Sequence, residues 1–211
     1  MAAPLLVIGN KNYSSWSLRP WLAMKVLGIP FQELRIPLYG PGSKDKILAH
    51  SPAGKVPVLV DGETHVWDSL AILEYLAERH PGVWPGDAAQ SARARSISAE
   101  MHSGFPGLRN HMSMNIRRRH PGKGRTPEVL GEIRRIAEIW NECRGPFLFG
   151  AFCAADAMYA PVVLRFRTYE VQLAAVCRAY ADAVLALPGL QEWMRDAERE
   201  TESLPQFEQT A

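Results

Sequence analysis

The first 80 residues alternate short apolar runs with segments of helical spacing. The run LLVIG at residues 5–9 is typical of a fully buried strand, and apolar side chains then recur at helical spacing from Leu18 to Val26. Residues 31–36 alternate apolar and polar side chains, as a half-buried strand does, and residues 44–50 are predicted to form a short helix. The chain is therefore predicted to open with a strand, a helix, a strand and a short helix.

A hairpin and a further helix complete this half. The stretch VPVLVDGETHVW holds two β-rich runs joined through Asp61 and Gly62, a dipeptide that favours a tight turn between antiparallel strands. Asp68 or Ser69 is predicted to begin the next helix, because both residue types cap helices and apolar residues follow at helical spacing. The predicted order is β-α-β-α-β-β-α.

The second half has helical periodicity and lacks a convincing strand pattern. It predicts helices near residues 89–118, 126–143, 154–167, 171–187 and 190–200. Prolines and glycines between residues 80 and 90 indicate a linker. We therefore predict an α/β domain at residues 1–80, a linker at 81–89 and an all-α, helical-bundle domain at 90–211. The ending SLPQFEQTA is predicted to be a mobile tail.

Composition narrows the classes of function. In 211 residues, 24 Lys and Arg nearly balance 22 Asp and Glu, which argues against nucleic acid or an anionic membrane as the main partner. Three cysteines without a Cys-x-x-Cys pair, and histidines without ligand spacing, argue against a disulfide framework or a metal site. We expect a cytoplasmic protein with a small ligand, because neither a signal peptide nor a membrane span is recognisable in the sequence.

The stretch SSWSLRP at residues 14–20 places serines between a strand and a helix. Pro20 lacks a backbone N–H and fits best in the first helical turn, so Ser17 is the better predicted cap; a cap at Ser14 would cost up to about 3 kcal/mol. Ser14 and Ser15 then lie in a loop near the positive end of a helix, where an anion is favoured. Serines before helices usually satisfy only local backbone groups, so this spacing alone leaves both roles open. Without a Gly-x-Ser-x-Gly elbow, a serine here is a better donor than nucleophile.

Three motifs, in this order, resemble the cytosolic glutathione S-transferase family of the serine type, nearest to the zeta class. They are SSWSLRPWLA at residues 14–23, GKVPVL at 54–59 and WDSLAILEYL at 67–76. The resemblance covers nearly the whole chain and implies a thioredoxin-like domain followed by a helical domain, glutathione as co-substrate and a homodimer. It assigns Ser14, helped by Ser15, to activation of the glutathione thiol. A hydrogen bond to a charged group is equivalent to about one or two pKa units, so one hydroxyl would make thiolate a major species near neutral pH.

The other two motifs imply a glutathione site. The resemblance gives a cis bond before Pro57, which lets the Val56 backbone pair with the cysteinyl unit, and assigns Asp68 and Ser69 to the γ-glutamyl end. Lys55 is expected to reach the glycyl carboxylate. Each residue also has an ordinary interpretation: a strand-edge proline, two helix-capping residues and an exposed lysine.

Two positions depart from the family pattern. The capping box at Asp156 has Cys153 where the family has Ser or Thr, and a thiol is a poor acceptor, so a weaker helix start by about 1 kcal/mol is expected. Thr168 occupies the position at which zeta-class maleylacetoacetate isomerases carry an arginine for the substrate carboxylate. Arg165 and Arg167 lie nearby at other offsets.

The pocket for the electrophilic acceptor is predicted to contain Trp16, Met112, Met114 and Arg165, with both methionines on the long helix that faces the serine loop.

The basic segment at residues 117–125 is interpreted as a solvated loop, since aromatic residues are not interleaved with its charges. We predict a transferase that conjugates glutathione to a small electrophile. Two alternatives stay open: a glutathione-dependent cis-trans isomerase, or a non-catalytic protein that binds glutathione or a hydrophobic ligand.

Overall fold

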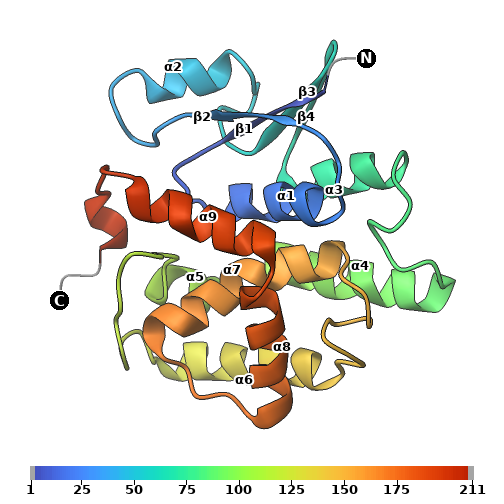
Figure 1. The fold of residues 1–211 in the computed structure, drawn as a ribbon. Helices are drawn as coiled ribbons and strands as arrows, with labels where there is room; N and C mark the ends of the chain where they lie inside the picture. Colours follow the sequence, from blue (N-terminus) through green and yellow to red (C-terminus); the bar gives the residue numbers. More distant parts are fainter. Residues whose placement is uncertain (1–2, 209–211) are drawn as a thin grey trace.

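The structure, a computed structural model, describes residues 3–208 and begins with a mixed α/β unit (Figure 1). Its elements are β1 (Leu5–Ile8), α1 (Ser15–Val26), β2 (Gln32–Arg35), α2 (Ser43–Leu48), β3 (Val58–Asp61), β4 (Thr64–Trp67) and α3 (Ser69–Ala77). This order confirms the predicted β-α-β-α-β-β-α arrangement, and the unit is thioredoxin-like.

Within the described residues the strands form one sheet in the order β2-β1-β3-β4. Strand β1 is parallel to β2 and antiparallel to β3, and β3 pairs with β4 through the predicted hairpin. Helices α1 and α3 cover one face, and α2 covers the other (Figure 1). Leu6 and Ile8 of β1 pack in the larger core with α1 and α3, whereas Val7 packs with Ile47 of α2. Burial on both faces explains why β1 is continuously apolar.

The second unit is helical. It comprises α4 (Ala88–Ser103), α5 (Pro106–His111), α6 (Pro127–Asn141), α7 (Ala154–Tyr169), α8 (Ala175–Leu185), α9 (Pro188–Arg199) and a short 3-10 helix η1 (Pro205–Phe207). Almost every residue of α7 is buried, and α7 packs against α1 and α4, so it joins the two units. The fold is the predicted thioredoxin-like domain followed by a helical domain, while the exact domain limits stay a prediction.

The single helix predicted at residues 89–118 is wrong. The chain leaves α4 at Gly104, Phe105 adopts a left-handed conformation with φ 60°, and Pro106 opens the separate helix α5. Pro106 lacks an N–H and disfavours helical geometry at the residue before it, which ends the first helix. Residues 112–118, including Met112 and Met114, follow α5 and are not helical.

The predicted cap of α1 is also wrong. The helix begins at Ser15 with Ser14 at the cap position, and Pro20 lies inside it, where the chain has no N–H to offer the Trp16 carbonyl. The Ser17 hydroxyl does not cap the helix; its oxygen accepts a hydrogen bond from the Gly9 N–H at 3.1 Å. That bond ties the end of β1 to the first turn of α1.

The tail predicted to be mobile is ordered as far as the structure describes it. Leu204 and Glu208 are buried, and η1 lies between them. Residues 209–211 lie outside the described residues. Helices long and apolar enough to cross a lipid bilayer are absent from residues 3–208.

Candidate functional site

A cavity of about 800 Å³ lies where the two units meet. Its walls include most of the residues singled out in the sequence: Ser14, Ser15, Trp16, Lys55, Val56, Pro57, Asp68, Ser69, Met114 and Arg165. Met112 is fully buried in the core instead, and its carbonyl accepts a hydrogen bond from Arg165. The fold therefore gathers three separate motifs of the first unit against one face of the second.

Ser14 lies at the cap position of α1 without acting as a side-chain cap. Among the described residues its hydroxyl bonds none of the free N–H groups of the helix, and it donates to Ser17 Oγ at 2.8 Å. Its side chain lines the cavity and is 7% exposed. A hydroxyl therefore lies next to the positive end of α1, where negative charge is stabilised.

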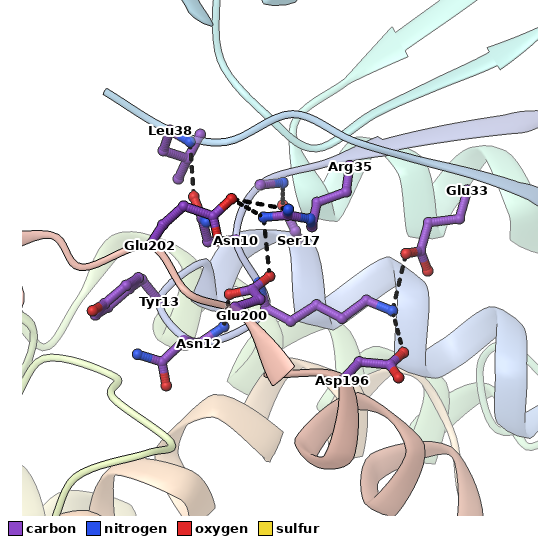
Figure 2. Close-up of polar contacts among 12 residues, drawn as sticks. Asn10, Asn12, Tyr13, Ser17, Glu33, Arg35, Leu38, Asp196, Glu200 and Glu202 are labelled. Atoms are coloured by element: carbon purple, nitrogen blue, oxygen red, sulfur yellow. Dashed lines mark hydrogen bonds and ion pairs between the residues drawn. The ribbon is translucent and has the colours of Figure 1, made fainter. Parts of the chain in front are cut away.

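The loop before Ser14 is fixed from both units (Figure 2). Asn10 Oδ1 accepts a hydrogen bond from the Leu38 N–H at 2.7 Å. From beyond α9, the Glu200 carboxylate accepts the N–H groups of Lys11 and Asn12 at 2.7 and 3.1 Å. These bonds hold the approach to Ser14 in one conformation.

A short stretch of extended backbone forms another wall. The peptide bond between Val56 and Pro57 is cis, as the resemblance implied. Within residues 3–208, neither the N–H nor the C=O of Val56 makes a backbone hydrogen bond, so both can pair with a peptide. Lys55 is exposed beside them at the cavity wall.

The start of α3 supplies a polar corner. Asp68 caps the helix by accepting the Leu70 N–H at 2.9 Å, and its backbone has the positive φ of 77°. Its other carboxylate oxygen lies 3.4 Å from Nε2 of His102, whose pKa is lowered chiefly by burial. Ser69 is fully buried, and its hydroxyl accepts a hydrogen bond from Arg19 at 3.3 Å. This corner carries both an acid and a helix N-terminus.

Guanidinium groups surround the acceptor side of the cavity. Arg165 of α7 is 6% exposed and donates to Ser15 Oγ at 3.2 Å and to the Met112 carbonyl. Burial, and then the charge of Arg109, lowers the pKa of Arg165 to about 10, which leaves it charged at neutral pH. Among the described residues, Asp68 is the one acidic side chain that lines the cavity, and it lies at the start of α3. The acceptor side is therefore electropositive.

Two guanidinium groups lie over the ring of Trp16. The Arg19 and Arg109 guanidiniums lie 4.2 and 4.8 Å from the centre of its ring, within the range of cation–π attraction. The wall also contains Arg109, Tyr13, Tyr39 and Phe207, none of which the sequence analysis predicted. Arg109 lies just beyond a helix break and Phe207 near the end of the chain, so neither belongs to a motif with recognisable spacing.

Arg167 and Thr168 do not line the cavity, although Thr168 occupies the position at which the zeta-class pattern has an arginine. Arg167 donates to the Met194 sulfur at 3.6 Å, and Thr168 donates to the Asn115 carbonyl at 2.9 Å.

The basic segment at 117–125 is not simply a solvated loop, because Arg117 donates to the backbone carbonyls of Glu200 and Glu202 in the C-terminal segment, residues 200–208. In the described part of the chain, His, Cys, Asp and Glu side chains form no group of three or more that could hold a metal ion.

Two family models match the chain. The glutathione S-transferase N-terminal domain matches residues 13–79, and the glutathione S-transferase C-terminal domain matches residues 123–196. The chain belongs to the glutathione S-transferase family. The resemblance drawn from the three motifs is thereby confirmed, and the family uses glutathione as its co-substrate.

Zeta-class proteins are among the relatives of this glutathione S-transferase. A probable maleylacetoacetate isomerase of Caenorhabditis elegans is 37% identical over 110 residues, which are 51% of this chain and 50% of that protein. A zeta-class glutathione S-transferase of Euphorbia esula is 27% identical over 215 residues, which cover 95% of this chain and 94% of that one. The maleylacetoacetate isomerase of Methylobacterium extorquens AM1, solved with malonate and glutathione, has a TM-score of 0.70 at 21% identity and covers 95% of this chain and 100% of that chain. At that identity the solved structure shows a shared fold.

Proposed function

We propose that this glutathione S-transferase conjugates glutathione to a small electrophile and that Ser14 stabilises the glutathione thiolate. The observation that carries the proposal is the Ser14 hydroxyl, which lines the cavity at the start of α1 without capping it. In this mechanism the thiol proton leaves to water and Ser14 donates to the sulfur. The thiolate then attacks the electrophile, a carbon–sulfur bond forms, and the leaving group departs with the bonding electron pair.

The cavity wall formed by the loop before β3 and the start of α3 offers partners for the peptide part of glutathione. Its cysteinyl backbone would pair with the N–H and C=O of Val56 in the manner of an added strand. The Asp68 carboxylate suits the α-ammonium, and Ser69 with the start of α3 suits the α-carboxylate. Lys55 would bind the glycyl carboxylate, and these contacts aim the thiol at Ser14.

Substitution of Ser14 by Ala tests the proposal. Because a hydrogen bond to an anion contributes roughly 1.5–3 kcal/mol, we expect the bound-thiol pKa to rise by about one to two units in Ser14→Ala. The pKa is measured from the ultraviolet absorbance of the thiolate in the glutathione complex. Glutathione affinity at low pH, where the thiol is protonated in both proteins, is the control. An unchanged pKa would remove Ser14 from the mechanism, and binding without thiol ionisation near neutral pH would indicate a non-catalytic binding protein.

A second candidate function is glutathione-dependent cis-trans isomerisation of an anionic, conjugated substrate. Arg165 favours it, because this buried cation faces the cavity with a hydroxyl and a carbonyl as its hydrogen-bond partners among the described residues. The thiolate would add to the double bond, the resulting single bond would rotate, and the thiolate would leave again. Glutathione is then regenerated rather than consumed.

The role of Arg165 is tested by comparing a carboxylate-bearing electrophile with an uncharged one. We expect Arg165→Met to lower kcat/KM for a carboxylate-bearing electrophile by 10-fold or more, because a hydrogen-bonded ion pair in a buried site is lost. Activity with an uncharged electrophile should change much less. Arg167→Met is the control, since Arg167 points to Met194. Equal losses for both electrophiles would assign Arg165 a structural role.

We also propose that the protein acts as a homodimer in the cytoplasm, as the family resemblance implies. Analytical ultracentrifugation of the purified chain tests the dimer directly. A monomer at micromolar concentration that retains full activity would contradict it.

A further inference from the structure

Ser17 lies behind Ser14 in the first turn of α1, away from the cavity wall. It is fully buried, and its Oγ accepts two hydrogen bonds, from the Gly9 N–H at 3.1 Å and from the Ser14 hydroxyl at 2.8 Å. Gly9 follows β1 directly, so this bonded chain runs from the end of the sheet through α1 to the cavity. Figure 2 shows Ser17 beside the loop that begins at Asn10.

The number of hydroxyl hydrogens limits what Ser14 can do alone. Each serine has one hydroxyl hydrogen, and Ser14 directs its own to Ser17 in this structure. To donate to a sulfur, Ser14 must turn that hydrogen into the cavity, and its oxygen then faces the oxygen of Ser17 at hydrogen-bond distance. Two oxygens so close are favourable only when one donates to the other.

Ser17 has the means to reverse the bond. The Gly9 N–H can only donate, so it keeps one lone pair of Ser17 Oγ engaged and leaves the Ser17 hydrogen free to turn towards Ser14. The bonds then run in one direction, from the Gly9 N–H to Ser17, from Ser17 to Ser14, and from Ser14 to the sulfur. Successive hydrogen bonds that point the same way polarise and strengthen one another.

We propose that Ser17 is a positioning residue for the thiolate: it turns its hydroxyl to donate to Ser14 when Ser14 donates to the glutathione sulfur. The proposal rests on the function proposed for Ser14. It gives the buried serine a role in ionisation in addition to its bond to the end of β1.

Removal of the Ser17 hydroxyl tests this role. We expect Ser17→Ala to raise the bound-thiol pKa by up to about one unit, less than Ser14→Ala does, because it weakens the Ser14 bond to the sulfur without deleting it. The kcat/KM below that pKa should fall by up to about 10-fold, while the affinity for glutathione at low pH stays unchanged. Ser98→Ala is the matched control, since Ser98 is also fully buried but lies on α4 away from the cavity.

A double substitution separates positioning from a general structural effect. In the Ser14→Ala background, Ser17→Ala should leave the thiol pKa where Ser14→Ala alone puts it, because the relay then has no final donor. An unchanged pKa in the single Ser17→Ala variant, or an equal rise in both backgrounds, would overturn the role of Ser17. An unchanged pKa in Ser14→Ala would instead overturn the proposed function, so the two failures are distinguishable.

Two further variants cover the case in which Ser17→Ala does not fold. Ser17→Thr keeps a hydroxyl and should retain the parent thiol pKa. Ser17→Cys keeps a similar volume but is a weak donor, so it should raise the pKa, read from the pH dependence of kcat/KM. The same pKa in both variants would overturn the proposal.

Discussion

Tyr13 precedes Ser14 and lines the same cavity, so its hydroxyl is a second candidate to activate a thiol. The hydroxyl is already engaged: it donates to the Glu208 carboxylate and accepts from Arg117 at 3.0 Å and from the Leu204 N–H at 3.3 Å. All three partners belong to the C-terminal segment or to the loop that holds it. Tyr13 therefore links the loop before α1 to the C-terminal segment, and Ser14 remains the proposed donor.

Tyr13→Phe separates these roles. We expect the bound-thiol pKa to stay at its parent value while the free energy of unfolding falls by about 1–3 kcal/mol, because a hydrogen bond to a carboxylate is lost. Urea denaturation and the thiolate titration measure the two quantities. Tyr39→Phe is the control, since Tyr39 lines the cavity but is 72% exposed. A rise in the thiol pKa as large as that of Ser14→Ala would contradict this assignment.

Residues within contiguous motifs could be predicted, and residues brought together by folding could not. Ser14, Val56 and Asp68 belong to motifs whose order in the chain indicates a family, and the structure brings all three to one cavity, while their roles stay a prediction. The predicted cap at Ser17 is wrong because the local cost of Pro20 does not include the hydrogen bond from Gly9 to Ser17, which exists only once β1 packs beside α1. The same limit explains why Arg109 was missed and Met112 was wrongly expected in the wall.

Among the elements, the start of α7 depends on one buried carboxylate. Asp156 accepts the Cys153 N–H at 2.9 Å and the Leu148 N–H at 3.0 Å, so it caps the helix and anchors the preceding loop. The capping box was recognisable because its residues are three apart, whereas the bond to Leu148 was not. The break between α4 and α5 shows the opposite case, because Pro106 is a local signal that ends a helix and the apolar periodicity does not register it.

The burial of Asp156 predicts the sign of a pH dependence of stability. Burial raises its pKa to about 6, although both N–H donors oppose the shift. An unfolded Asp titrates near pH 4, so between these values the folded state binds more protons and the free energy of unfolding falls as pH rises. Asp156→Asn mimics the protonated acid and does not titrate. From pH 4 to 7 we expect the stability of the parent relative to this variant to fall by up to about 3 kcal/mol, measured by urea denaturation at each pH. A difference that does not change with pH would contradict the shift.

At the scale of the whole molecule, residues 200–208 form hydrogen bonds to both units beside the cavity. Arg117 donates to the carbonyls of Glu200 and Glu202, and the Glu202 carboxylate accepts from Arg35 of β2 at 2.9 Å (Figure 2). Beyond this anchor, Phe207 packs against Tyr13 and forms part of the cavity wall. At the cavity this segment therefore contacts the rings of Tyr13 and Tyr39 through Phe207.

Deletion of residues 205–211 tests whether this segment serves the acceptor side of the cavity. The shortened chain loses the apolar surface of Phe207 and the Glu208 carboxylate that accepts from Tyr13, but it keeps the Arg117 anchor. We expect KM for an apolar electrophile to rise by about 10-fold, the equivalent of part of a buried aromatic side chain. The bound-thiol pKa should stay within about 0.3 unit and the affinity for glutathione within twofold, because Ser14 keeps its bond to Ser17 and Asp68 keeps its bond to the Leu70 N–H. Steady-state kinetics with each substrate varied in turn measure both, and a chain that ends at Glu208 is the control. A loss of glutathione affinity as large as the change in KM would mean that the segment supports the whole cavity rather than its acceptor side.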